Sequence, residues 1–321
     1  KDTAVTAPND SALRQHDDAQ FPEEDFRENG IEERDRPRPA LRIEAPARQT
    51  APVVFASPHS GRDYPPEFIA ASKLNKLNLR RSEDAFMDEV FAAAPDWGAP
   101  LLCAEFPRAY VDANREAFEL DPKMFTDPLP DYVNTSSPRV SAGLGTIARI
   151  VTDGDDIYHA PLRFEDARHR IETFHRPYHE ALKQLLVATR ERFGCCLLVD
   201  CHSMPSGAAP RSSSRSKPAD VVLGDCFGTA CAPDVTETAR KTLQSVGFHV
   251  TCNKPYAGGF TTRHYGRPDD GIHVLQIEIN RGLYMDEKRI RRGAGMAELT
   301  RRITLLVGTL VGIDPAILKP T

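Results

Sequence analysis

Histidines follow two apolar runs of the sequence, at the point where each run ends. His59 comes after the run APVVFASP, and His202 ends the run CLLVDCH. Short apolar runs bounded by turn residues are typical of buried strands, and α/β folds bind their ligands at the carboxyl ends of such strands. Each imidazole is therefore a candidate metal ligand or general base.

Glu278 lies inside a further apolar run, between Ile277 and Ile279 in LQIEINR. Side chains alternate along a strand, so this carboxylate points to the face opposite the two isoleucines. Because burial without a partner would cost several kcal/mol, we expect it to face a polar cavity or a cation. Two histidines and a carboxylate that leave one coordination position open for water are the pattern of catalytic zinc. A further carboxylate beside that water would serve as the general base of a hydrolase.

Two other motifs carry charged side chains. RSEDAF places Glu83 and Asp84 at the start of a predicted helix, where they could simply complement the helix dipole. RAYVDANR contains Arg108 and Arg115, which alone could form surface ion pairs. The net charge of -5 gives no broad cationic surface, so an anionic partner would have to be bound by such local arginines.

The elements that would position these groups alternate along the chain. Strands are predicted over residues 53–56, 100–104, 109–112, 196–200, 220–223, 249–252 and 273–279. Helices are predicted over residues 83–94, 162–193 with a break near Pro177, 235–246 and 287–311. This alternation predicts an α/β fold with a mixed, mostly parallel central sheet flanked by helices. Residues 49–321 would form this single domain, whereas residues 1–48, rich in Asp, Glu, Arg and Pro, predict a polar N-terminal arm.

The composition is that of an ordinary globular protein. Of its 321 residues, 40% are hydrophobic and 27% charged, and no apolar stretch approaches the roughly 20 residues needed to cross a bilayer. The seven cysteines are an odd number without a CxxC pair, which favours free thiols in a reducing compartment over disulfides or a thiolate metal site. We therefore expect a cytoplasmic protein with a small-molecule substrate and no nucleic-acid or membrane partner. The irregular segment 116–161 is typical of a functional cover or an insertion.

Six motifs, in order, closely resemble the N-formylglutamate amidohydrolase family: PHSG, RAYVDANR, VDCHSMPS, VVLGDCFGTAC, NKPYAGGFTTRHYG and LQIEINRGLYMDE. The likeness runs from about Val53 to Glu287. This family looks related to the zinc carboxypeptidases and aspartoacylases, which implies a mixed eight-stranded sheet between helices and not the Ser-His-Asp α/β-hydrolase fold. The resemblance implies metal-dependent hydrolysis of N-formyl-L-glutamate to formate and L-glutamate, a step of histidine breakdown.

The resemblance also implies a role for each polar group. The implied zinc ligands are His59, Asp84 and His202. Glu278 matches the general base, and Arg108 would polarise the scissile carbonyl group. The pair Asn114 and Arg115 would bind a carboxylate of the substrate by charge-assisted hydrogen bonds.

The carboxylate ligand departs from the pattern of the carboxypeptidase-like relatives. They place it three residues after the first histidine, where this sequence has Arg62, and an arginine cannot bind a metal ion. The resemblance points to RSEDAF instead. Asp84 is the expected ligand, with Glu83 and Asp63 as alternatives.

Four more residues are expected near the site. Arg263 is the candidate for a second substrate carboxylate, with Arg281 in reserve. His264 follows a pair of glycines, which allow close approach of the backbone to a ligand, and we expect it to line the pocket. Asp200 alternates to the same face as His202 and could orient its imidazole through the second ring nitrogen.

His175 and His179 are four residues apart, which places both on one face of a helix and could hold a metal ion. Residue 176 is an arginine where a metalloprotease has its glutamate, and Pro177 interrupts the turn. We therefore expect these histidines to pack the helix or to support the site from behind.

Two other functions stay open from the sequence. A deacylase of another N-acyl acidic amino acid would use the same metal chemistry, and an added methyl group changes the fit to a pocket by only about 1–3 kcal/mol. A non-catalytic protein that binds small acids could also keep this scaffold.

Overall fold

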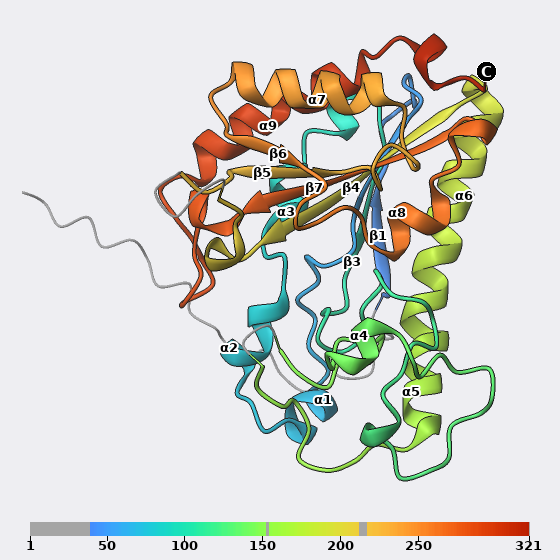
Figure 1. Ribbon diagram of the computed structural model, residues 1–321, viewed down its shortest axis with the longest axis vertical. Coiled ribbons are helices and arrows are strands. Elements are labelled where there is room, and N and C mark those ends of the chain that lie inside the picture. Colours follow the sequence, from blue (N-terminus) through green and yellow to red (C-terminus); the bar gives the residue numbers. More distant parts are fainter. Residues whose placement is uncertain (1–38, 152–153, 212–216, 321) are drawn as a thin grey trace, which may run out of the picture. The chain divides into compact units, whose positions relative to one another are not determined.

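A mixed β-sheet lies at the centre of the protein, as the computed structural model shows for residues 39–151, 154–211 and 217–320 (Figure 1). In these residues the sheet has seven strands in the order β1-β3-β2-β4-β7-β5-β6, one fewer than the resemblance implies. Their bounds are β1 Leu41–Glu44, β2 Val53–Ser57, β3 Leu101–Ala104, β4 Cys196–Met204, β5 Val221–Gly224, β6 Val250–Cys252 and β7 Ile272–Asn280. Residues 1–38, most of the expected N-terminal arm, lie outside the described part of the chain.

Parallel pairing brings the ends of the central strands together. β3, β2, β4 and β7 run parallel to one another, whereas β1 is antiparallel to β3 and β5 is antiparallel to β7. The prediction of a mixed, mostly parallel sheet is therefore confirmed. The carboxyl ends of β2, β4 and β7 lie at the same edge of the sheet, so side chains at or just beyond these ends can meet.

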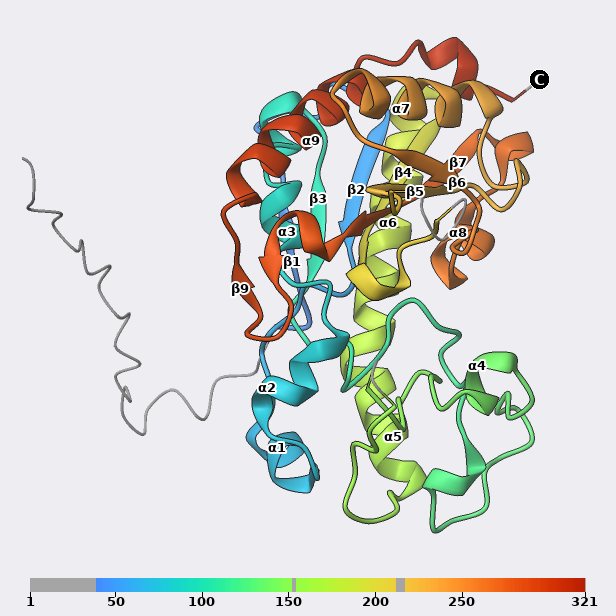
Figure 2. The same ribbon diagram turned by 60° about the vertical axis from the view of Figure 1, so that its left-hand side comes forward.

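Helices cover both faces of the sheet (Figure 2). Their bounds in the described chain are α1 Pro66–Ala71, α2 Lys76–Leu79, α3 Met87–Val90, α4 Pro138–Ser141, α5 Phe164–Arg170, α6 Arg176–Phe193, α7 Pro233–Ser245, α8 Phe260–Tyr265 and α9 Met296–Val311. α3, α7 and α9 share one hydrophobic core with the sheet, and α1, α2 and α6 share the core on the opposite face. None of these helices is both long and apolar enough to cross a membrane.

The two faces of β4 and β7 differ in character, and this difference creates the site. On one face Val199 and Ile277 are buried in the core with α9. On the other face Leu198 and Val274 are buried beside α6, but the following positions on that face carry polar side chains. These polar side chains are Asp200, His202, Gln276 and Glu278. The apolar half anchors the strands, since each buried aliphatic side chain contributes about 1.5–3 kcal/mol, and the polar half is held rigidly at the sheet edge.

Three predicted elements differ from the observed ones. The helix predicted over residues 83–94 shortens to α3, because Phe86 at its start has a left-handed backbone with φ of 68°. Residues 109–112 form a turn followed by irregular chain instead of a strand, and the amide of Asp112 donates to the carbonyl of Thr146. The last helix begins only at Met296, because the residues before it form a small antiparallel pair, β8 Met285–Asp286 and β9 Arg291–Arg292.

Two further elements were only partly foreseen. β1 lies within residues 1–48, expected to be a polar arm, and it extends the sheet by pairing with β3. The break predicted near Pro177 takes the form of a π-helical turn over Ile171–His175, directly before α6. Helical residues precede Pro177 without a gap, so its missing amide hydrogen removes one helical hydrogen bond, and the wider π-turn lies at this point of the helix.

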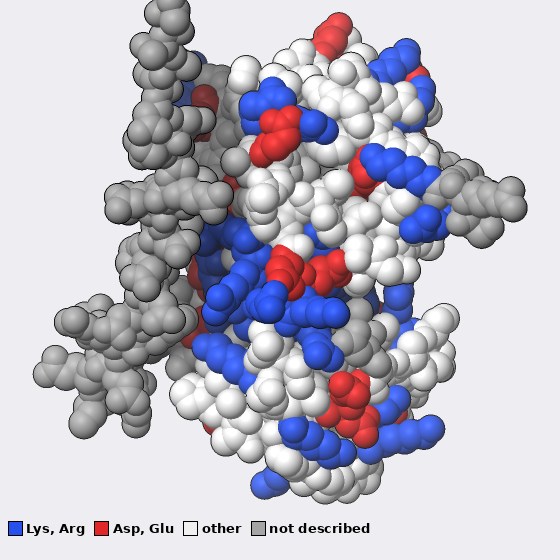
Figure 3. Space-filling model, turned by 90° about the vertical axis from the view of Figure 1, so that its left-hand side faces the viewer, with Lys and Arg blue, Asp and Glu red and all other residues white. Residues whose placement is uncertain are grey.

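Basic and acidic side chains alternate on the surface of the described residues. Examples of exposed ion pairs are Arg292 with Glu89 and Arg289 with Asp286, with nitrogen-to-oxygen distances of 2.7 and 2.8 Å. The face drawn in Figure 3 shows Lys and Arg gathered in a band across its middle, with Asp and Glu next to them. Such exposed pairs add little to stability.

Candidate active site

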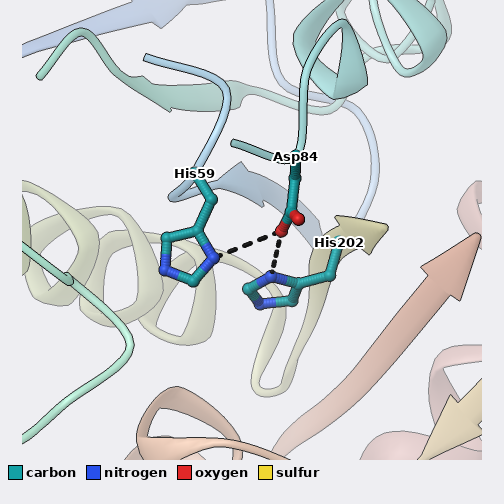
Figure 4. A group of neighbouring side chains, drawn as sticks. All are labelled: His59, Asp84 and His202. Atoms are coloured by element: carbon teal, nitrogen blue, oxygen red, sulfur yellow. Dashed lines mark hydrogen bonds and ion pairs between the residues drawn. The ribbon is translucent and has the colours of Figure 1, made fainter. Parts of the chain in front are cut away.

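Two imidazoles and one carboxylate converge at the carboxyl ends of β2 and β4 (Figure 4). Nδ1 of His59 lies 3.2 Å from Oδ2 of Asp84, and Nδ1 of His202 lies 2.9 Å from the same oxygen. The amide of Asp84 also donates to the carbonyl of His59 at 3.0 Å, which holds the loop before α3 against the turn after β2. The three side chains are buried, and one ligand atom from each lies within 4.8 Å of the others. The expected convergence of these residues is therefore observed.

The second nitrogen of each ring faces another carboxylate. Nε2 of His59 lies 2.8 Å from Oδ1 of Asp112. Nε2 of His202 forms its hydrogen bond with Nδ2 of Asn114 at 3.1 Å, and it lies 3.0 Å from Oδ2 of Asp200, in the range of an ion pair but not at the angle of a hydrogen bond. Metal-binding histidines are commonly oriented by an acceptor at the other ring nitrogen. Asp200 thus lies where the sequence analysis expects it. Asp112 was given no role there, and its nearness to Asn114 and Arg115 in RAYVDANR was the available signal.

The charges of the cluster stabilise one another. Burial disfavours the charged form of Asp84, but hydrogen bonds with His202 and His59 outweigh it and hold the pKa of this carboxyl well below its usual value. Burial also disfavours the charged form of His202, but Asp200 and Asp84 raise its pKa well above the usual range. Two imidazole nitrogens and a carboxylate oxygen, aimed at one point and oriented from behind, suit a divalent ion such as zinc.

Arg281 fixes the position of Asp84. Its Nη2 donates to Oδ1 of Asp84 at 2.9 Å, its Nε donates to Oγ of Ser203 at 3.0 Å, and its Nη1 donates to the carbonyl of Arg81 at 3.0 Å. Arg281 lines the cavity described below, but each of its three nitrogens already bonds to the protein. Its observed contacts are thus with the protein, whereas the prediction from the sequence was a reserve role in binding the substrate.

The two alternative carboxylate ligands lie apart from the cluster. Glu83 accepts hydrogen bonds from Tyr64 at 2.7 Å and from Arg80 at 2.9 Å, so its side chain turns away from Asp84. Asp63 is not part of the group that could hold a metal ion among the described residues. Asp84 is therefore the carboxylate that the fold brings to the two histidines.

Glu278 lies beside the cluster without belonging to it. In the parallel register of β4 and β7, Glu278 pairs with His202, and its Oε1 accepts a hydrogen bond from Nε2 of Gln276 at 2.9 Å. The side chain lines the cavity although the residue is only 8% exposed. Burial, with Asp84 and Asp200 nearby, raises the pKa of Glu278 to about 7. A carboxyl group with these properties suits proton transfer near neutral pH.

A cavity of about 490 Å³ opens onto this group. It is lined by His59, His202 and Glu278, by Arg108, which was expected to polarise the scissile carbonyl group, and by the expected substrate-binding residues Asn114 and Arg115. Nε of Arg108 donates to Oδ2 of Asp112 at 3.0 Å, and Nε of Arg115 donates to the carbonyl of Leu144 at 2.8 Å. Oδ1 of Asn114 accepts from the amide of Thr261 at 2.8 Å.

Glycine at position 259 is required by the approach of Asn114. A Cβ atom built there would overlap with the side-chain amide of Asn114. The Gly258-Gly259 pair lines the cavity. Arg263 and His264, which follow the pair, lie outside the cavity wall.

Arg263 and His264 do not line the cavity. Arg263 is exposed, and its Nη1 donates to the carbonyl of Gly258 at 2.8 Å. His264 stacks on Phe260, with ring centroids 4.8 Å apart, and lines a separate surface hollow. Arg139, in α4, lines the cavity instead, and it was not singled out in the sequence.

His175 and His179 support the turn that carries Asn114 and Arg115, on the side of α6. Nε2 of His179 lies 2.8 Å from the carbonyl of Ala113, and Nε2 of His175 lies 2.9 Å from the carbonyl of Arg115. Burial lowers the pKa of His175, and burial together with His175 lowers that of His179 to about 3. Both rings are neutral at physiological pH and donate from Nε2. The expected supporting role, not metal binding, agrees with this geometry.

Comparison with known proteins identifies the relatives of this chain. The family model of N-formylglutamate amidohydrolase matches residues 51–285. N-formylglutamate deformylases from Pseudomonas aeruginosa and Pseudomonas putida are each 27% identical, covering 80% and 74% of this chain and 91% and 82% of those proteins. The crystal structure of N-formylglutamate amidohydrolase from Ralstonia eutropha JMP134 is similar with a TM-score of 0.79 and 36% identity, covering 84% of this chain and 96% of that one. A gene product of Agrobacterium tumefaciens, at 18% identity and a TM-score of 0.59, shares the fold.

Proposed function

Because this chain belongs to the N-formylglutamate amidohydrolase family, we propose that it hydrolyses the formamide bond of N-formyl-L-glutamate to formate and L-glutamate with the help of a divalent metal ion. The observation that carries the proposal is the position of Glu278, next to His202 in the β4–β7 register and beside the group of His59, Asp84 and His202. A base next to a metal-binding group is the arrangement that hydrolysis of an amide by water needs.

The metal would be held by His59, Asp84 and His202, and zinc is the ion that this donor set favours. When bound, such an ion supplies a Lewis acid and lowers the pKa of an adjacent water molecule. Asp112 keeps the imidazole of His59 oriented, Asn114 together with the nearby charge of Asp200 keeps that of His202 oriented, and Arg281 keeps the carboxylate oriented. These contacts fix the donors before any ligand arrives, which limits the entropy lost on binding.

The remaining polar residues act on the substrate. Glu278 takes the proton of the attacking water and returns it to the departing amine, so that formate and the free amino group form together. Arg108, whose side chain is 26% exposed, can reach the formyl oxygen and stabilise the negative charge that develops there. Asn114 and Arg115 bind one substrate carboxylate. We place this reaction in histidine breakdown, in the cytoplasm, in keeping with seven free thiols.

A formate-release assay tests the proposal. Protein loaded with zinc is expected to release formate from N-formyl-L-glutamate, to lose this activity with a chelator, and to act less well on N-acetyl- and N-succinyl-glutamate. Faster turnover of the other acyl groups would identify a different deacylase, and metal binding without turnover would identify a binding protein.

The variant Glu278→Gln tests the base. It is expected to lower kcat by at least about 100-fold while the metal content per chain stays unchanged. Glu67→Gln, at an exposed carboxylate in α1, is the matched control and should behave like the unaltered protein. Undiminished kcat in Glu278→Gln would refute the assignment of the base.

A further inference from the structure

One wall of the cavity is built by the irregular segment between β3 and α5. Leu144, Ala148, Ile150 and Val151 from this segment line the cavity together with Arg139. Four apolar side chains and a single cation thus face the space in front of Glu278 and His202. This wall matches a short hydrocarbon chain that ends in a negative charge.

Arg139 is a cation without an internal partner. Its guanidinium group has no hydrogen bond or ion pair with any residue in the described part of the chain, and the residue is exposed at the cavity wall. Arg281, in contrast, donates to Asp84, Ser203 and the carbonyl of Arg81. Arg115 donates to the carbonyls of Leu144 and Asn114. Arg139 is therefore free to bind a ligand without breaking a bond of the protein.

Like charges gather at this end of the cavity. Burial lowers the pKa of Arg115 to about 10; Asp112 opposes this change, and the neighbouring guanidinium groups of Arg108 and Arg139 contribute to it. Asp112 bonds to Arg108 and lies 3.4 Å from Arg115, so it compensates these two but not Arg139. A bound anion would relieve the repulsion among the three cations.

We propose that Arg139 binds the side-chain carboxylate of the substrate and so selects acidic over neutral N-formyl amino acids. The inference rests on the proposed function and assigns to Arg139 the role that the sequence analysis gave to Arg263. Asn114 and Arg115 bind the other carboxylate, and the two methylene groups of the glutamyl side chain lie against Leu144 and Ile150. A neutral side chain would leave Arg139 unpaired and gain nothing from it.

Substrate pairs and matched variants test this assignment. kcat/KM is measured for N-formyl-L-glutamate and for N-formyl-L-norvaline, which lacks the side-chain carboxylate, with the unaltered protein and with Arg139→Met, Arg139→Lys and Arg263→Met. Arg139→Met is expected to lower kcat/KM for N-formylglutamate by about 10- to 100-fold, mainly through KM, and to leave that for N-formylnorvaline unchanged. Arg139→Lys should restore part of the preference, because it keeps the charge but not the forked geometry. Arg263→Met should keep the full preference.

The possible outcomes separate this inference from the proposed function. If the unaltered protein hydrolyses N-formylglutamate well and Arg139→Met keeps its preference for it, the role of Arg139 is refuted and the proposed function stands. A loss of preference in Arg263→Met, but not in Arg139→Met, would likewise refute it. An unaltered protein with no preference for the acidic substrate would overturn the proposed function and this inference together. Equal melting temperatures of all four proteins would exclude misfolding as the cause of any difference.

Discussion

His179 should make the stability of this protein fall as the pH is lowered. The ring is packed behind the Asn114 segment, with Nε2 at 2.8 Å from the carbonyl of Ala113 and Nδ1 at 2.9 Å from the hydroxyl of Tyr265. Burial, assisted by His175, lowers its pKa from 6.5 to about 3. Between these two values the unfolded chain binds a proton at this residue and the folded protein does not, so protons favour unfolding.

The size of the effect follows from the difference between the two pKa values. The contribution of the neutral His179 ring to the free energy of unfolding is fully present above pH 6.5. At pH 5, one and a half pH units below that value, about 2 kcal/mol of it is lost. The ring is partly exposed, so solvent screening makes this an upper value. His179→Gln keeps a donor that can reach the carbonyl of Ala113 but cannot titrate.

Urea denaturation at pH 8 and pH 5 measures this linkage, with a chelator present so that metal release does not contribute. The difference in the free energy of unfolding between the unaltered protein and His179→Gln is expected to shrink by up to about 2 kcal/mol on going to pH 5. His169→Gln, at an exposed histidine of α5, is the control for removing an imidazole from the chain. A difference that stays constant or grows on acidification would refute the reasoning.

Two more substitutions test the support of the site. Asp112→Asn removes the charge that orients His59 and pairs with Arg108. It should lower metal affinity about 10- to 100-fold, measured as metal content per chain at a series of free zinc concentrations. Unchanged affinity would contradict this role of Asp112. Gly259→Ala forces the side chain of Asn114 to shift. It should lower kcat/KM more than about 10-fold and leave the melting temperature little changed, since misplacing a reacting group by about 1 Å can lower the rate about 100-fold. Gly207→Ala, where a Cβ meets no atom within 4 Å, is its control, and equal loss in both would show that the contact with Asn114 is not the cause.

The sequence predicts the parts of the site that buried strands carry. β2, β4 and β7 are covered on both faces, so they appear as continuous apolar runs, and their parallel order brings the residues at their ends together. This is why His59, His202 and Glu278 could be placed near one another. Asp84 comes from a loop without regular periodicity, and the resemblance to a known family, not the pattern of residues, distinguished it from Glu83.

The sequence could not predict the parts that loops bring in. Arg263 and Arg139 are both exposed arginines in irregular or short helical segments, and no periodicity indicates which of them faces the cavity. Arg263 turns toward the carbonyl of Gly258. Arg139 lines the cavity because the fold brings its segment, which is far in sequence from β4 and β7, to the cavity wall. The strand predicted at residues 109–112 is absent for a related reason. Its backbone bonds to Thr146 in that same segment instead of to a neighbouring strand.

The charges buried around the cluster explain why the fold can keep so many ionisable groups together. Four carboxylates, from Asp84, Asp112, Asp200 and Glu278, lie within this region, together with the three guanidinium groups of Arg108, Arg115 and Arg281. Unpaired buried charges are costly, so each carboxylate needs a cation or a hydrogen-bond donor close to it. Asp84 has Arg281, and Asp112 has Arg108 and Arg115, whereas Asp200 and Glu278 depend on His202 and Gln276. A divalent cation at His59, Asp84 and His202 would lie against the buried carboxylate of Asp84, which gives metal binding a role in stability as well as in catalysis.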